Sequence, residues 1–267
     1  ADLAAAFEHG FVYEGQHSLY RGRRHGRPAR DVPSKRFIVF AQNHDQVGNR
    51  AQGDRLSTAA SFDRLKLAAA SVLLSPFVPM LFMGEEYADP APFLYFVDHS
   101  DPDLIEAVRE GRKREFASFG WSETPPDPQS PDSLARSRLD HTLIEQPQHR
   151  VMHELTRELL RLRRDHPALR DLNKDRLIAV PNERSRTLLV LRGPVEGRQT
   201  ALLLSFADSL PRTSIQLPEG DWRTILDSHD DRWRGAGRVA ADRFSSRGVA
   251  EIDMPSPGFL LLERETP

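Results

Sequence analysis

The apolar run at residues 37–41 constrains the fold of this chain more than any other feature. It shows no alternation of polar and apolar residues, which is typical of a strand buried on both faces. Amide, imidazole, carboxylate and guanidinium side chains follow at once, over residues 42–50. Polar groups at the carboxyl end of a buried strand are the arrangement of α/β active sites. An ordinary strand exit with polar turn residues is the alternative interpretation.

A second apolar run, at residues 78–83, ends in two adjacent glutamates. Apolar residues recur on one face over residues 61–74, which predicts a helix between the two runs. Strand, helix and strand form a parallel crossover unit, so both polar clusters are expected at one edge of the sheet. The four side chains expected to share a cleft there are His44, Asp45, Glu85 and Glu86. Because Glu85 and Glu86 are adjacent, they are expected to point opposite ways at a strand end.

Further helices are predicted to end at Gly10, to begin at Asp101-Pro102 and to end near Arg164. Beyond these helices the pattern changes to short strands separated by turns, which predicts an antiparallel β-sandwich. The boundary between the two parts is placed near residue 172. The predicted strands cover residues 177–180, 187–191, 201–206, 213–217, 222–226, 249–252 and 259–262.

Composition excludes several classes of protein. A net charge of −2 gives no electrostatic argument for binding nucleic acid or an anionic membrane. No apolar run approaches the roughly 18 residues of a membrane span, and the N-terminus lacks the pattern of a signal peptide. The absence of cysteine excludes disulfides and thiolate metal sites. It is compatible with a reducing cytoplasm without demanding one, and the cytoplasm is the expected location. The histidines show no metal-ligand spacing, so neither a metal nor a cofactor is predicted.

The motifs resemble those of a known enzyme family. Residues 37–46 are similar to the seventh-strand motif of the α-amylase family of glycoside hydrolases. The sequences at residues 46–50 and 53–56 resemble the branch of that family that acts on maltooligosyltrehalose. Stretches within residues 10–26 and 82–99 agree as well, in the family's order, so that the resemblance spans nearly the whole N-terminal half.

This resemblance implies the C-terminal part of a (β/α)8 TIM barrel at residues 1–172, followed by an antiparallel β-sandwich domain at 173–267. A closed barrel takes about 200–250 residues, and only two buried parallel strands are predicted before residue 173. In the family the nucleophilic aspartate and the acid/base glutamate follow the fourth and fifth strands, so both are expected to precede residue 1. The expected partner is the missing N-terminal half of the same enzyme, without which the chain is expected to be inactive.

The resemblance also assigns roles to residues. Asp45 matches the family's third carboxylate, which stabilises the oxocarbenium-like transition state through sugar hydroxyls. Tyr87, Phe93 and Tyr95 are candidates for aromatic walls around trehalose, although each could simply pin its loop to the core. The expected substrate-binding residues are His44, Asn43, Gln46, Arg50, Glu85, Glu86, Tyr87, Phe93 and Tyr95.

The implied reaction is retaining hydrolysis of the α-1,4 bond next to the terminal trehalose unit of maltooligosyltrehalose, which releases trehalose and a maltooligosaccharide. One alternative is a glycogen-branching or other transferase of the same family. Another is a non-catalytic carbohydrate-binding fragment. A third is nucleic-acid binding through the arginine-rich loop at residues 20–30, which predicts binding that weakens steeply with salt.

Overall fold

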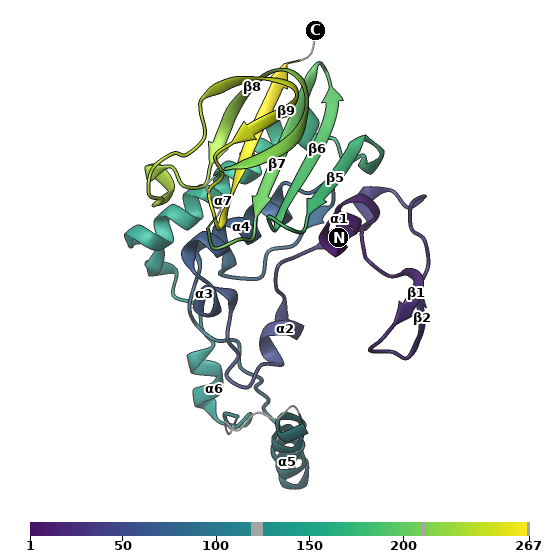
Figure 1. Ribbon diagram of the computed structural model, residues 1–267. Coiled ribbons are helices and arrows are strands. Elements are labelled where there is room, and N and C mark those ends of the chain that lie inside the picture. Colours follow the sequence, from purple (N-terminus) through teal and green to yellow (C-terminus); the bar gives the residue numbers. More distant parts are fainter. Residues whose placement is uncertain (119–124, 210–211, 266–267) are drawn as a thin grey trace. The chain divides into compact units, whose positions relative to one another are not determined.

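The computed structural model describes residues 1–118, 125–209 and 212–265 (Figure 1). The chain divides into two compact units. The first comprises Ala1–Val39, Lys66–Met80 and Glu154–Pro267, and the second comprises Phe40–Leu65 and Leu81–His153. The domain boundary predicted near residue 172, between the C-terminal portion of a barrel and a β domain, stays a prediction.

The first unit is built on one six-stranded sheet with the order β5-β6-β7-β10-β8-β9 (Figure 1). All of its neighbouring strands are antiparallel, which confirms the predicted antiparallel β domain. The six strands are β5 (Leu177–Asn182), β6 (Thr187–Val195), β7 (Arg198–Ser205), β8 (Thr213–Asp227), β9 (Arg243–Ile252) and β10 (Gly258–Glu265).

Two details of this sheet differ from the prediction. The strands predicted at residues 213–217 and 222–226 are one long strand, β8, whose pairing with β9 shifts register between Leu217 and Gly220. A bulge of this kind bends a strand without ending it. The strands also form a single curled sheet instead of two facing sheets, so that residues from β6 to β10 share one hydrophobic core.

The central strands of this sheet are buried on both faces. Leu189 and Leu203 point into the core enclosed by the curl, whereas Leu188 and Leu204 are equally buried but belong to the opposite face. The short helix α8 (Pro167–Arg170) packs against β6 and β7. Because both faces are covered, the central strands lack the alternating pattern of a half-exposed sheet.

The predicted parallel crossover unit is present in a shortened form. Strand β3 (Ile38–Val39) pairs in parallel with β4 (Val78–Pro79), and α4 (Phe62–Leu73) lies between them in the sequence. The prediction that the first run is buried on both faces is wrong: Ile38 is 62% exposed, and the other four residues of the run are half-buried. Among the described residues β3 pairs only with β4, so much of its surface has no neighbouring strand to cover it.

The three remaining helix predictions are confirmed. Helix α1 (Asp2–His9) ends at Gly10, whose left-handed φ of 97° suits glycine. Asp101 accepts a hydrogen bond from the backbone N–H of Asp103 at the start of α5 (Pro102–Ser118), and α7 (Pro147–Asp165) ends one residue past Arg164. The other elements are β1 (Glu14–Ser18), β2 (Arg23–Gly26), η1 (Ser34–Arg36), α2 (His44–Gly48), α3 (Leu56–Ala59), η2 (Glu85–Tyr87), α6 (Pro131–Arg136), η3 (His141–Glu145), η4 (Lys174–Arg176) and η5 (Asp231–Trp233).

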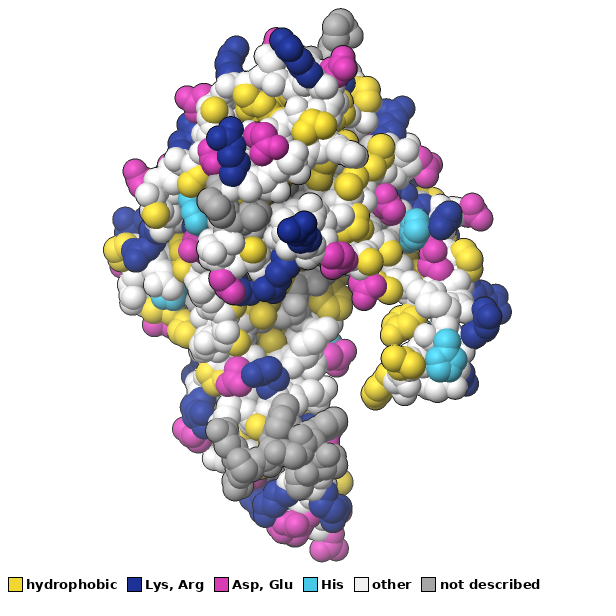
Figure 2. Space-filling model, in the orientation of Figure 1, with side chains coloured by type: hydrophobic (Ala, Val, Ile, Leu, Met, Phe, Trp, Pro, Cys, Tyr) yellow, Lys and Arg dark blue, Asp and Glu magenta, His cyan; other side chains and the backbone are white. Residues whose placement is uncertain are grey.

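The surface carries few large apolar side chains that are fully exposed. The clearest are Leu19 and Tyr20, 92% and 94% exposed, between strands β1 and β2; apolar side chains of this hairpin are visible in Figure 2. None of the helices in the described part of the chain combines the length and apolar character that crossing a membrane requires.

Candidate functional site

The short helix α2, which follows β3 in the chain, carries the predicted catalytic carboxylate. Its start is held by a capping box. Asn43 Oδ1 accepts hydrogen bonds from the backbone N–H groups of Asp45 (2.8 Å) and Gln46 (3.3 Å). In return, Gln46 Oε1 accepts from the backbone N–H of Asn43 at 2.8 Å. Asn43 and Gln46 therefore position α2, whereas their predicted contacts with sugar stay a prediction.

Replacing Asn43 by Ala is expected to destabilise the protein by about 1 kcal/mol, because α2 loses the acceptor for two backbone N–H groups. Asn43→Asp keeps that acceptor and should restore most of the stability. Urea unfolding of the full-length polypeptide that contains this chain measures both variants. Equal stability of Asn43→Ala and the parent protein would show that the capping box contributes nothing.

His44 and Asp45 lie side by side on the first turn of α2. Their side chains are 69% and 72% exposed, and His44 Nε2 is 3.3 Å from Asp45 Oδ1. An ionised carboxylate accepts hydrogen bonds from hydroxyl groups, and an imidazole N–H donates them. The pair therefore presents an acceptor and a donor to a polyhydroxylated ligand.

Glu85 connects the two polar segments that the sequence predicts to converge. Its Oε2 accepts hydrogen bonds from Gln42 Nε2 at 3.2 Å and from the backbone N–H of Phe82 at 3.3 Å. Glu85 and Glu86 lie in the 3-10 turn η2 and not at a strand end, so the alternation of a strand does not set their directions. Both glutamates are half-buried. Burial raises the pKa of Glu85 to about 7, against the lowering effect of its bonds to Gln42 and Phe82.

This pKa predicts a pH dependence of stability. Between about pH 4.5 and pH 7 the folded protein retains the proton of Glu85, whereas the unfolded chain has lost it. The stability that this proton confers is complete below pH 4.5 and is lost as the pH rises through 7. The loss should be at most about 3 kcal/mol, since one pKa unit corresponds to about 1.4 kcal/mol and solvent screening reduces it. Urea unfolding at pH 5 and pH 8 should show a smaller difference for Glu85→Gln than for the parent protein; equal differences would contradict the assignment.

Arg55 was not predicted as a site residue, yet it organises this part of the chain. Its side chain is buried, and Nη1 donates to the Met83 carbonyl at 2.7 Å while Nε donates to the Ala91 carbonyl. The guanidinium carbon lies 4.7 Å from the centre of the Phe82 ring. Burial lowers the pKa of Arg55. The only signal in the sequence was its place within the motif at residues 53–56.

The rest of that motif is also explained by packing. Gly53 has a φ of +62°, and a side chain there would meet the backbone of Phe93 at 2.6 Å. Asp54 binds the guanidinium of Arg50 at 3.1 Å, and the N–H of Leu56 donates to the side chain of Gln42 at 3.0 Å. The motif therefore holds the loop that follows α2. Arg50, predicted to bind substrate, is engaged by Asp54 in this structure.

The predicted aromatic residues occupy different environments. Phe93 is half-buried and packs edge-on against Phe82, with 5.4 Å between ring centres. Tyr95 is 44% exposed, and the guanidinium of Arg112 lies 4.6 Å from its ring centre. Because Arg112 also donates to the Gly48 carbonyl at 3.0 Å, Tyr95 lies near the C-terminal end of α2.

Tyr87 lies in the interior instead. Its side chain is completely buried, and its hydroxyl bonds to Asp89 Oδ2 at 3.1 Å and His141 Nδ1 at 3.2 Å. Asp89 is itself buried and accepts from the backbone N–H of Asp140 at 2.9 Å. This network gives Tyr87 a packing role, so Tyr95 is the better placed of the two tyrosines for contact with a sugar.

The site therefore consists of the exposed His44–Asp45 pair at the start of α2. Glu85 is hydrogen-bonded to Gln42, just before α2, and Tyr95 lies near the C-terminal end of that helix. Within residues 1–118, 125–209 and 212–265, no group of three or more His, Cys, Asp or Glu side chains is arranged to hold a metal ion. The arrangement can accept and donate hydrogen bonds to hydroxyl groups and offers one exposed aromatic face.

Comparison with solved structures defines the class of protein. No protein-family model matches the chain. A crystal structure from Salmonella typhimurium, assigned as an α-amylase, matches this whole chain at 34% identity with a TM-score of 0.77; the match covers 41% of that chain. The fold of this chain is therefore similar to that of α-amylase family enzymes.

Sequence relatives define the branch more narrowly. Malto-oligosyltrehalose trehalohydrolase from Brevibacterium helvolum is 46% identical over 175 residues, which are 64% of this chain and 30% of the relative. The same enzyme from Rhizobium sp. (strain M-11) is 42% identical over 227 residues, which are 82% of this chain and 37% of the relative. The chain spans about a third of the length of these curated relatives. Over that third it is related to malto-oligosyltrehalose trehalohydrolases.

Proposed function

We propose that this chain is part of a retaining α-glycoside hydrolase that cleaves the α-1,4 bond next to the terminal trehalose unit of maltooligosyltrehalose. The observation that carries the proposal is the exposed Asp45 carboxylate, 3.3 Å from His44, in a chain 46% identical to a trehalohydrolase over 175 residues. The products are trehalose and a shortened maltooligosaccharide. The proposed location is the cytoplasm.

In this proposal Asp45 stabilises the transition state. A retaining glycosidase needs a nucleophile and an acid/base carboxyl about 5 Å apart, and hydroxyl hydrogen bonds that strengthen as the oxocarbenium-like state forms. Asp45 accepts those hydrogen bonds, and His44 donates to a hydroxyl of the same glucose unit. The negative charge of Asp45 also raises the pKa of a nearby acid, which keeps that acid protonated.

The nucleophile and the acid/base are proposed to come from polypeptide outside this chain. The relatives are about three times as long as the region that aligns, which leaves room for such a segment. In the part of the chain that the structure describes, β3 pairs with β4 only and Ile38 is exposed, which supports strands that belong to a larger barrel.

Product analysis on maltopentaosyl trehalose tests the proposal in the full-length polypeptide. Released trehalose supports the hydrolase, and new branch points would instead support the alternative of a branching enzyme or other transferase. The isolated chain is expected to show no turnover. Binding of maltooligosaccharide without turnover, even by the full-length polypeptide, would favour a carbohydrate-binding protein over an enzyme.

A further inference from the structure

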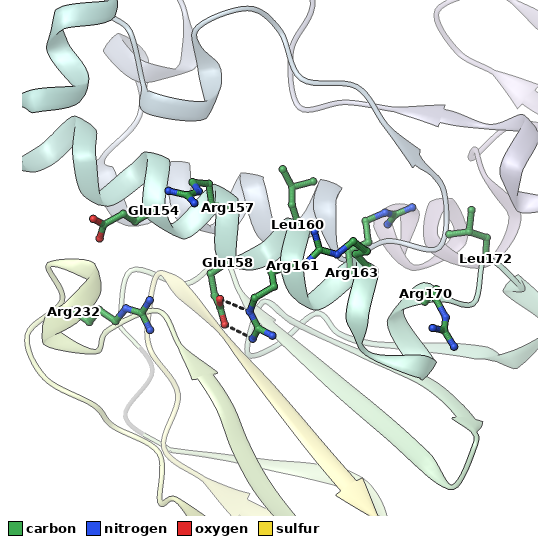
Figure 3. Close-up of a pocket in the computed structure, with 10 residues that line it drawn as sticks. Glu154, Arg157, Glu158, Leu160, Arg161, Arg163, Arg170, Leu172 and Arg232 are labelled. Carbon is green, nitrogen blue, oxygen red and sulfur yellow. Dashed lines mark hydrogen bonds and ion pairs between the residues drawn. The ribbon is translucent and has the colours of Figure 1, made fainter.

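A second concave site lies in the first unit, between α7, the segment that follows it and the turn η5 (Figure 3). It is a cavity of about 1000 Å³ that six arginines and two glutamates line together with two leucines. The arginines are Arg157, Arg161, Arg163, Arg164, Arg170 and Arg232. None of these residues belongs to the site proposed for the sugar substrate. Three of these arginines already engage carboxylates outside the lining, Arg161 and Arg164 with Asp165 and Arg170 with Glu196, so the excess of positive charge rests on Arg157, Arg163 and Arg232.

Two of the arginines in and near the cavity, Arg163 and Arg192, are at least partly buried. Arg163 donates to the carbonyls of Leu73 (3.0 Å), Ser75 (2.6 Å) and Phe77 and, in the described part of the chain, has no carboxylate within ion-pair distance. Nearby Arg192 is 2% exposed and likewise donates only to carbonyls. Burial, together with the charge of Arg163, lowers the pKa of Arg192 to about 9. Buried Arg192 and half-buried Arg163 thus have carbonyl groups as their hydrogen-bond acceptors, and the charge of Asp171 acts on Arg192 as well.

Two exposed arginines of the cavity, Arg157 and Arg232, have N–H groups that can donate hydrogen bonds to a ligand. Arg161 holds Glu158 through two hydrogen bonds of 2.7 and 2.8 Å, drawn in Figure 3, so the carboxylate of Glu158 is already engaged. The guanidinium carbon of Arg232 lies over the Trp233 ring, 4.3 Å from the ring centre. Over residues 1–118, 125–209 and 212–265, neither Arg157 nor Arg232 forms an ion pair with a carboxylate, and both are exposed.

We propose that this cavity binds a small, multiply charged anion of the phosphate or pyrophosphate class. Guanidinium groups match phosphate oxygens with two parallel hydrogen bonds, and here they come from α7 and from η5, which are far apart in the sequence. The volume lies at the upper end of the range for small-molecule sites. Buried Arg192 and half-buried Arg163 add positive charge that water screens less than it screens a fully solvated cluster.

Isothermal titration calorimetry with inorganic pyrophosphate tests this site in the full-length polypeptide, without any sugar present. Saturable binding to one site is expected, weaker at higher salt. Arg157→Gln and Arg232→Gln should each weaken binding about tenfold, the usual effect of losing a charge-assisted hydrogen bond. Arg247→Gln, an exposed arginine on β9 outside the cavity, is the charge-matched control and should bind as the parent protein does.

Absence of pyrophosphate binding in the full-length polypeptide would overturn the proposal, because it would mean that the cavity is covered or its cations are already satisfied. Equal weakening by Arg232→Gln and Arg247→Gln would also overturn it, since net charge alone would then explain the binding. Trehalose release is measured separately on the same proteins, so failure of the anion site and failure of the proposed hydrolase remain distinguishable.

Discussion

Asp45→Asn in the full-length polypeptide is expected to lower kcat for trehalose release by about 10²–10³-fold, the usual effect of removing one group that stabilises charge in the transition state. The amide has nearly the same shape as the carboxylate but lacks its negative charge. It therefore no longer stabilises the positive charge that develops on the sugar ring. Because the Asp45 side chain is 72% exposed, the substitution should leave the fold intact. KM should change much less than kcat.

The matched control is Asp103→Asn, a similarly exposed carboxylate in the first turn of α5. It should retain the activity of the parent protein. Thermal unfolding of both variants shows whether either has lost structure. If Asp45→Asn releases trehalose at the parent rate, the assignment of Asp45 to the transition state is wrong, and with it the role proposed for α2.

The largest loss of stability is expected for Glu263→Gln in the first unit. Glu263 lies on β10 with its side chain completely buried, and three cationic or polar partners surround it. His166 Nε2 is 2.9 Å from Oε1, Arg223 Nε donates to Oε2 at 2.6 Å, and Arg198 donates to Oε1. Removing the charge leaves two arginines facing a neutral amide. Breaking a buried ion pair in this way costs about 3–5 kcal/mol, and the partial exposure of both arginines favours the lower end.

Urea unfolding measures this loss as a decrease in the free energy of unfolding. Glu251→Gln is the control, because Glu251 is an exposed carboxylate on β9, and a surface substitution there should stay within about 0.5 kcal/mol. If Glu263→Gln loses as little stability as Glu251→Gln, solvent compensates the charges of the two arginines, and the cluster does not stabilise the sheet.

Several elements of this protein were predictable because they depend on local pattern. The apolar face of α4 was read from residue spacing, and Leu65, Ala69, Val72 and Leu73 are indeed buried. The antiparallel strands followed from short apolar runs between turn residues. Spacing could not show that residues 213–227 form a single strand, because Pro218 and Gly220 look like a turn and instead form a bulge.

The candidate site was less predictable from the sequence than the fold. The motif around Asp45 identified the exposed pair. Asn43 and Gln46 are predicted either to orient that pair or to reach the sugar, and the structure shows them in a capping box that fits their spacing. Arg55 was overlooked, since nothing local indicates that a guanidinium in a loop will be buried against two carbonyls. The sequence could not show which of Tyr87 and Tyr95 is buried, because residue spacing predicts burial only in regular helices and strands, not in an irregular loop.

By itself the sequence determined the strand, helix and strand of the parallel crossover unit and the antiparallel character of the β domain. Only the tertiary structure decided that Gln42 meets Glu85, that the pKa of Glu85 rises to about 7, and that Tyr87 lies inside while Tyr95 is exposed. The physical reason is that local patterns depend on residues close in the sequence, whereas the contacts of a side chain also depend on residues distant in it. Periodicity records which face of one element is buried, whereas desolvation and hydrogen bonding of a side chain depend on residues that the folded chain brings to it from far along the sequence.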